Sequence, residues 1–141
     1  MNKNGPIILV EDDIDDQLFF VEAFKELNFK NEIIFFSDGQ LALDYLTGTN
    51  SEPFIVFSDI NMPKLNGIEL REKVHENEDM RLKTIPYLFF TTAAEQKSVV
   101  DAYSKSIQGF FIKPADFEEL KNLVKIIVEY WQNCVSPNYV K

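Results

Sequence analysis

Polar side chains that could take part in a reaction recur directly after short apolar runs in this sequence. They are Glu11, Asp12 and Asp13 after one run, Ser58, Asp59 and Asn61 after another, Thr91 and Thr92 after a third, and Lys113 after the last. A carboxylate can attack phosphorus as a nucleophile, while a lysine and a hydroxyl can stabilise the charge of a transferred phosphoryl group. If the fold brings these side chains together, they suit the transfer of a phosphoryl group to a carboxylate.

The apolar runs themselves predict buried strands. They span residues 7–10, 33–36, 54–57, 87–90 and 110–112, and they consist of aliphatic and aromatic residues. Such continuous apolarity, without alternation, is typical of a parallel sheet that is covered on both faces.

The stretches between these runs predict helices. The first begins near Asp15 or Asp16 and carries Phe20, Phe24 and Leu27 on one stripe. Weaker patterns lie near 39–47, 67–78 and 95–105, and the last helix follows Asp116. Asp116 and Glu119 form a pattern like a capping box, and apolar residues then follow at helical spacing up to Trp131. Of the early acids, Asp13, Asp15 and Asp16 are expected to cap this first helix or to face solvent. His75, the only histidine, is expected to be exposed.

Five strands alternating with five helices predict a (βα)₅ chain, which forms an open parallel α/β sheet with helices on both faces. Ligands of such sheets bind beyond the carboxyl ends of the strands, so the polar residues should meet at one edge. Two carboxylates about 4 Å apart repel by about 4 kcal/mol at an effective dielectric constant near 20. Either one acid takes up a proton or a cation lies among them. Oxygen ligands without cysteine or histidine favour Mg²⁺.

The composition sets limits on the function. The 141 residues suit a single domain over 1–141, with a core at about 6–133 and short mobile ends at 4–6 and 136–141. A net charge of −9 disfavours direct binding to DNA or to an anionic membrane surface. The single Cys134 cannot form an internal disulfide, and neither a membrane span nor a signal peptide is predicted. A cytoplasmic protein is therefore expected.

The order of these landmarks resembles the response-regulator receiver domains of two-component signalling, and in particular the stand-alone chemotaxis type. The matching residues are Glu11-Asp12, Asp59-Ile60-Asn61-Met62-Pro63 with Gly67, Thr91, and Lys113-Pro114. The resemblance covers about residues 6 to 133. It implies the flavodoxin-like form of the (βα)₅ fold.

The resemblance also implies roles for the acidic residues. Asp59 is implied to be the phosphoacceptor, which attacks the phosphohistidine of a sensor histidine kinase or a histidine phosphotransfer protein. Asp12, Asp59 and the main-chain carbonyl of Asn61 are implied to ligate Mg²⁺. Glu11 is implied to act through water or as the outer member of the acidic pair.

Three further residues receive roles from the same resemblance. Thr91 and Lys113 are implied to contact the phosphoryl oxygens, and the family's cis Lys–Pro bond predicts a cis bond between Lys113 and Pro114. Thr91 and Phe110 are implied to form the switch. Phe110 stands where tyrosine is common in the family, so the aromatic member of the switch lacks the tyrosine hydroxyl here.

The preferred interpretation is a phosphorylation switch that binds partners, not an enzyme with an external substrate. By the resemblance, its partner-binding surface spans about residues 95–133, and dimerisation through the last helix stays open. An alternative is a small Mg²⁺-dependent phosphohydrolase similar to the haloacid-dehalogenase-like phosphatases. Those enzymes place a second acid two residues after the acceptor, where this chain has Asn61. A third possibility is a degenerate receiver, against which the intact Asp59, Asp12, Thr91 and Lys113 count.

Overall fold

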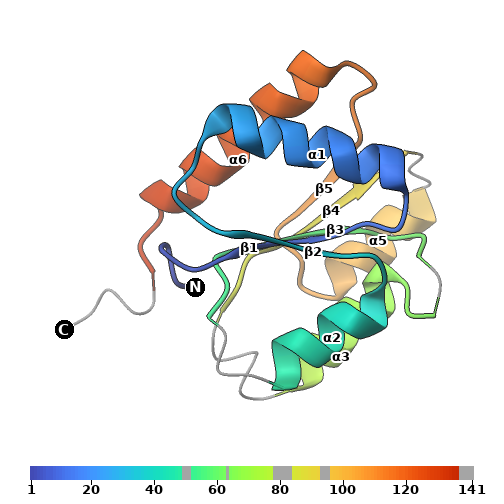
Figure 1. The fold of residues 1–141 in the computed structure, drawn as a ribbon. Helices are drawn as coiled ribbons and strands as arrows, with labels where there is room; N and C mark the ends of the chain where they lie inside the picture. The colour runs from blue at the N-terminus through green and yellow to red at the C-terminus, as the bar shows by residue number, and fades with distance from the viewer. Residues whose placement is uncertain (49–51, 63, 78–83, 93–95, 137–141) are drawn as a thin grey trace.

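The computed structural model describes residues 1–48, 52–62, 64–77, 84–92 and 96–136 (Figure 1). In chain order, its elements are β1 (Ile7–Val10), α1 (Ile14–Leu27), β2 (Ile33–Phe36), α2 (Gly39–Gly48), β3 (Ile55–Asp59), α3 (Gly67–Glu76), β4 (Tyr87–Thr91), α5 (Gln96–Ser104), β5 (Gly109–Ile112) and α6 (Phe117–Asn133). The predicted alternation of strands and helices is thereby confirmed, and every predicted strand lies within two residues of its observed bounds.

All the strands are parallel and lie in the order β2-β1-β3-β4-β5. The register pairs Val10 with Ser58, Asp59 with Phe90, and Thr91 with Ile112. The chain runs outward from β1 to β2 and then returns across β1 to β3. The point where the order reverses therefore lies between β1 and β3, and the carboxyl ends of these two strands carry the acids.

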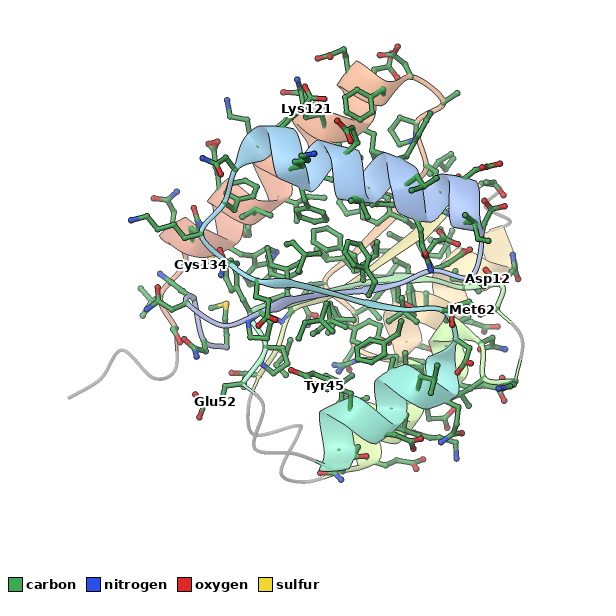
Figure 2. The ribbon with its side chains drawn as sticks, viewed as in Figure 1. Asp12, Tyr45, Glu52, Met62, Lys121 and Cys134 are labelled. Carbon is green, nitrogen blue, oxygen red and sulfur yellow. The ribbon has the colours of Figure 1, made fainter. Side chains whose placement is uncertain are left out.

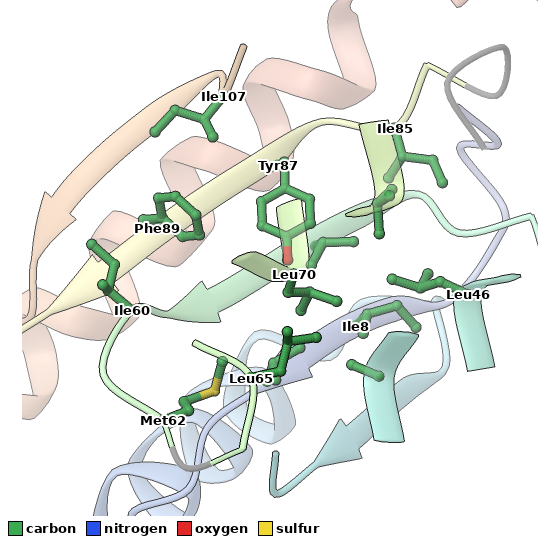
Figure 3. Packing of buried hydrophobic residues seen from close by; sticks show 14 of the residues in the cluster. Ile8, Leu46, Ile60, Met62, Leu65, Leu70, Ile85, Tyr87, Phe89 and Ile107 are labelled. Atoms are coloured by element: carbon green, nitrogen blue, oxygen red, sulfur yellow. The ribbon is translucent and has the colours of Figure 1, made fainter. Parts of the chain in front are cut away.

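Helices cover both faces of the sheet, with α1 and α6 on one face and α2, α3 and α5 on the other (Figure 1). Successive residues of β1 alternate between the two layers: Leu9 packs in the cluster with α1 and α6, and Ile8 in the cluster with α2 and α3. Figure 3 shows the second cluster, in which Ile8 and Tyr87 pack with Leu46 and Leu70. Because both faces are covered, the strands are apolar throughout, as the sequence pattern predicted.

Polar residues set the beginnings of the helices. The Asp13 side chain accepts a hydrogen bond from the Asp16 amide, so α1 begins at Ile14. The predicted start at Asp15 or Asp16 was therefore wrong, because the chain turns into the helix directly after the acidic pair. Asp116 caps α6 by accepting from the amide of Glu119, as predicted.

Gly67 lets α3 begin directly against the end of β3. A Cβ atom on Gly67 would lie 2.1 Å from the carbonyl oxygen of Asp59, so a larger residue cannot fit without movement of the backbone. The preceding Asn66 caps the helix, and its side chain and that of Glu69 form a reciprocal capping box. The absence of a side chain at Gly67 therefore allows the backbone of α3 to pack directly against the backbone of Asp59.

The N-terminal end is packed and is not the loose end that the sequence predicted. Met1 is 5% exposed, and the Asn31 side chain donates hydrogen bonds to the carbonyls of Lys3 and Gly5. At the other end, the Ser136 hydroxyl donates to the carbonyl of Met1 at 2.7 Å. The rest of the predicted mobile C-terminal end, 137–141, lies outside the described residues. Within the ranges that the structure describes, no helix has the length and apolarity needed to span a membrane.

Arg71 on α3 ties this helix to the turn that follows α5. Its Nε and Nη2 atoms donate to the carbonyls of Lys105 and Ser106, at 3.1 and 2.9 Å, and its guanidinium lies over the Tyr87 ring.

His75, one helical turn further on in α3, is half-buried beside a cavity of about 260 Å³, so the prediction that it is exposed was wrong. Leu46 of α2 and Val74 of α3 line the same cavity, and the polar sequence of α3 did not indicate this packing.

Candidate functional site

Three acids meet at the carboxyl edge of the sheet. One oxygen atom from each of Glu11, Asp12 and Asp59 lies within 4.8 Å of the other two. Glu11 is 1% exposed and Asp59 is 9% exposed, whereas Asp12 is exposed to solvent. Figure 2 shows Asp12 at this edge, above Met62, which follows β3. The site is therefore an acidic pocket that is buried on the strand side and open to solvent at Asp12.

Lys113 follows β5 and reaches into this acidic pocket. Its Nζ atom donates to Glu11 Oε1, lies 2.8 Å from Asp16 Oδ2 and lies 3.3 Å from Asp59 Oδ2. The Lys113 amide donates to the carbonyl of Thr91 at 2.7 Å, which continues the pairing of β4 with β5. The described residues contain no cis peptide bond, so the cis Lys113–Pro114 bond that the resemblance implies is not found. The lysine points inward here with a trans bond.

The orientation of Asp59 is set by its own backbone. The amide of Ile60 donates to Asp59 Oδ1 at 2.7 Å, which leaves Oδ2 facing Lys113. The hydroxyl of Ser58 donates to the Asp59 carbonyl at 2.8 Å. One carboxylate oxygen is thus held by an amide, and the other lies toward the charged groups of the pocket.

The other predicted site residues lie around this centre. Thr91 is buried at the end of β4, the strand between those of Asp59 and Lys113, whereas Thr92 is exposed. Asn61 is exposed in the segment after β3. Phe110 is half-buried on the α2, α3 and α5 side, where its ring packs edge-on against Phe89 at 6.3 Å.

The electrostatics of the pocket favour a bound cation. Burial, and then the nearby charge of Asp59, raise the pKa of Glu11 to about 8, although the contact with Lys113 opposes this shift. Burial alone would lower the pKa of Lys113, but its hydrogen bonds to Asp16 and Glu11 outweigh that effect and raise the pKa above its ordinary value. The lysine therefore stays charged. The pocket therefore gathers four carboxyl groups, those of Glu11, Asp12, Asp16 and Asp59, around the single ammonium of Lys113.

This donor set fits a hard divalent cation. All the candidate ligand atoms are oxygens, and neither cysteine nor histidine takes part in the group. Mg²⁺ prefers such ligands and keeps several of its own waters, so an open side at Asp12 suits it.

Asp16 is the site residue that the sequence analysis missed. It was expected to cap a helix or to face solvent, but its carboxylate contacts Lys113. The signal in the sequence was weak, because Asp12 precedes the cap residue Asp13 and helical spacing does not relate it to Asp16. Only the position of Asp16 in the first turn of α1, directly after the acidic pair, pointed toward the pocket.

A sequence model of the response regulator receiver domain matches residues 7–125 of this chain. The chain belongs to this family. Among curated relatives, the receiver is 37% identical over 129 residues to the probable methanogenesis regulatory protein FilR2 of Methanothrix harundinacea, which covers 89% of this chain and 82% of the relative. It is 27% identical over 140 residues to the response regulator Rcp1 of Synechocystis, which covers 96% and 94% of the two chains.

Solved receiver structures agree with the fold. The phosphorylated cyanobacterial phytochrome response regulator RcpA superposes with a TM-score of 0.84 at 25% identity, covering 95% of this receiver and 99% of that chain. The Mn²⁺-bound form of response regulator Rcp1 superposes with a TM-score of 0.82 at 27% identity, covering 94% and 99%. The predicted flavodoxin-like fold is therefore confirmed.

Family membership decides between the predicted functions. Receiver domains are signalling domains of two-component systems that accept a phosphoryl group from histidine kinases and act on downstream partners. They bind Mg²⁺ or Mn²⁺ at an acidic site. This chain is therefore a phosphorylation-dependent response regulator, and the alternative of a phosphohydrolase is not favoured.

Proposed function

We propose that Asp59 accepts the phosphoryl group. The observation that carries this proposal is the position of Asp59 Oδ2, which lies at the carboxyl end of β3, 3.3 Å from the Lys113 ammonium and within the acidic group. A carboxylate oxygen of Asp59 attacks the phosphorus of a phosphohistidine on a sensor histidine kinase or histidine phosphotransfer protein. The O–P bond forms as the P–N bond breaks, and the imidazole nitrogen keeps the electron pair and takes up a proton. The domain thus catalyses only its own phosphorylation and dephosphorylation.

In this proposal Mg²⁺ is the cofactor, and Asp12, Asp59 and the main-chain carbonyl of Asn61 would hold it, with Glu11 acting through water. The cation, when bound, offsets the negative charge that gathers on the phosphoryl oxygens and the acids. Lys113 supplies a second positive charge to the pocket, and its side chain is only 8% exposed. Thr91, buried between the strands of Asp59 and Lys113, supplies a hydroxyl to a phosphoryl oxygen.

The output surface in this proposal consists of α5, β5 and α6, close to the predicted 95–133. Several large apolar side chains are exposed there, namely Val100, Tyr103, Ile112, Ile126 and Tyr130. Thr91 and Phe110 link the pocket to this surface as the switch, because Thr91 pairs with β5 and Phe110 lies within it. The downstream protein, or a second copy of the chain, binds this face in one phosphorylation state. Residues 1–141 act as a single cytoplasmic domain, without direct contact to DNA or membrane.

Intact-mass spectrometry after incubation with acetyl phosphate tests the acceptor. Wild type should gain one phosphoryl group in the presence of Mg²⁺, and Asp59→Asn should gain none. Asp101→Asn is the matched control, because it removes the same charge from an exposed position on α5. Labelling of Asp59→Asn at the wild-type rate would refute the assignment, and rapid release of phosphate from ordinary phosphomonoesters would favour the phosphohydrolase.

A further inference from the structure

We propose that Asp16 is a positioning residue that holds the Lys113 ammonium in place for the incoming phosphoryl group. This inference rests on the proposed role of Lys113 as a phosphoryl contact. A charged lysine has three N–H donors, and here they meet the carboxylates of Glu11, Asp16 and Asp59. The contact with Asp16, at 2.8 Å, is shorter than the one with Asp59, at 3.3 Å. The ammonium is therefore drawn toward α1 and away from the nucleophile.

Asp16 differs from the other two carboxylates because it stands outside the group that could hold a cation. That group consists of Glu11, Asp12 and Asp59. When Asp59 is phosphorylated, one of its carboxylate oxygens is engaged in the new O–P bond, and Glu11, Asp12 and Asp59 are the residues that would hold a cation. Asp16 is the carboxylate that can keep its contact with Lys113 throughout.

The backbone of α1 fixes Asp16 relative to the pocket. The amide of Asp16 donates to the cap residue Asp13 at 3.0 Å, which holds the first turn of the helix. The side chain of Gln17 donates to the carbonyl of Glu11 at 2.6 Å, which ties the same turn to the end of β1. The Asp16 side chain is 30% exposed, so water partly screens its charge, while the backbone contacts of the first turn hold its position. Asp16 can therefore hold the Lys113 ammonium at one position in the pocket.

The test compares Asp16→Asn with Asp15→Asn. Asp15 is the neighbouring acid in the same helical turn and is exposed, so its substitution changes the net charge equally without a contact to Lys113. Steady-state phosphorylation by acetyl phosphate at saturating Mg²⁺ gives KM and kcat for each protein. The ¹H–¹⁵N NMR signal of the Lys113 ammonium, assigned with Lys113→Met, reports whether the lysine is held. Circular dichroism checks the fold, and Asp16→Glu tests rescue.

We expect KM for acetyl phosphate to rise about three- to tenfold in Asp16→Asn, as the loss of one partly buried charged contact implies, with a smaller change in kcat. The ammonium signal should broaden or disappear in the same variant, and both properties should stay near wild type in Asp15→Asn and recover in part in Asp16→Glu. An unchanged KM in folded Asp16→Asn, or an equal rise in Asp15→Asn, would overturn the proposal. If wild type takes up no phosphoryl group, the proposed function fails. The ammonium signal then decides by itself whether Asp16 holds Lys113.

Discussion

Binding of Mg²⁺ should displace a proton from Glu11 at neutral pH. Glu11 is 1% exposed, and burial together with the charge of Asp59 raises its pKa to about 8 in the metal-free domain. A divalent cation beside the carboxylate favours its ionised form and lowers that pKa. The proton therefore leaves as the cation binds, and the apparent affinity for Mg²⁺ must rise with pH.

The size of this effect follows from the pKa. With a pKa of about 8, the ionised fraction of Glu11 in the metal-free domain is about 0.01 at pH 6, about 0.09 at pH 7 and about 0.5 at pH 8. If Glu11 is fully ionised in the bound state, the apparent affinity rises about 50-fold from pH 6 to pH 8 and levels off above pH 9. At pH 7, about 0.9 proton is released for each cation bound.

Isothermal titration calorimetry with Mg²⁺ measures both quantities. Titrations in buffers with different ionisation enthalpies give the number of protons released, and titrations across pH 6 to 8 give the change in affinity. Glu11→Gln is the control, because it keeps the shape of the side chain and removes the titrating group. Its affinity should vary little over this range, and its proton release should fall close to zero.

A flat affinity in wild type between pH 6 and pH 8, without proton release, would refute this reasoning. It would mean that Glu11 is already ionised beside Lys113 before the cation binds. Equal pH dependence in wild type and Glu11→Gln would show instead that another group supplies the proton.

Three further outcomes are expected. In Mg²⁺-free protein, the free energy of unfolding of wild type, relative to that of Glu11→Gln, should fall as pH rises from about 4.5 to about 8, because folded Glu11 keeps a proton that the unfolded chain has lost; urea melts at several pH values measure this. Gly67→Ala should destabilise the fold by about 1–3 kcal/mol or more and slow phosphorylation, since its Cβ would lie 2.1 Å from the Asp59 carbonyl oxygen; unchanged urea midpoints and phosphorylation rates would contradict this. Arg71→Met should cost about 1–3 kcal/mol in urea melts, because it removes the donor to the Lys105 carbonyl and leaves the Ser106 carbonyl with only the Gln108 side chain, and hydrogen exchange should quicken at that turn first.

Much of the fold was predictable because the local signals agree with one another. The apolar runs of β1 and β4 are continuous, the cap of α6 is explicit at Asp116, and the strands and helices alternate. The exact start of α1 at Ile14 could not be read from the sequence, because four aspartates stand close together and each is a good cap by residue type. The packed N-terminus was missed because its contacts are with Asn31 and Ser136, which lie far away in the sequence.

The residue types that follow each strand can be read along the chain, and parallel pairing then carries Glu11, Asp12, Asp59, Thr91 and Lys113 to one edge. This much follows from strand order, because the carboxyl ends of parallel strands always meet. The packing of separate elements sets which acids Lys113 contacts, how deeply Glu11 is buried and that Asp16 turns into the pocket. Those properties depend on distances of a few ångströms between separate elements and on the exclusion of water. The spacing of residues along the chain gives neither the distances between elements nor the degree to which water is excluded.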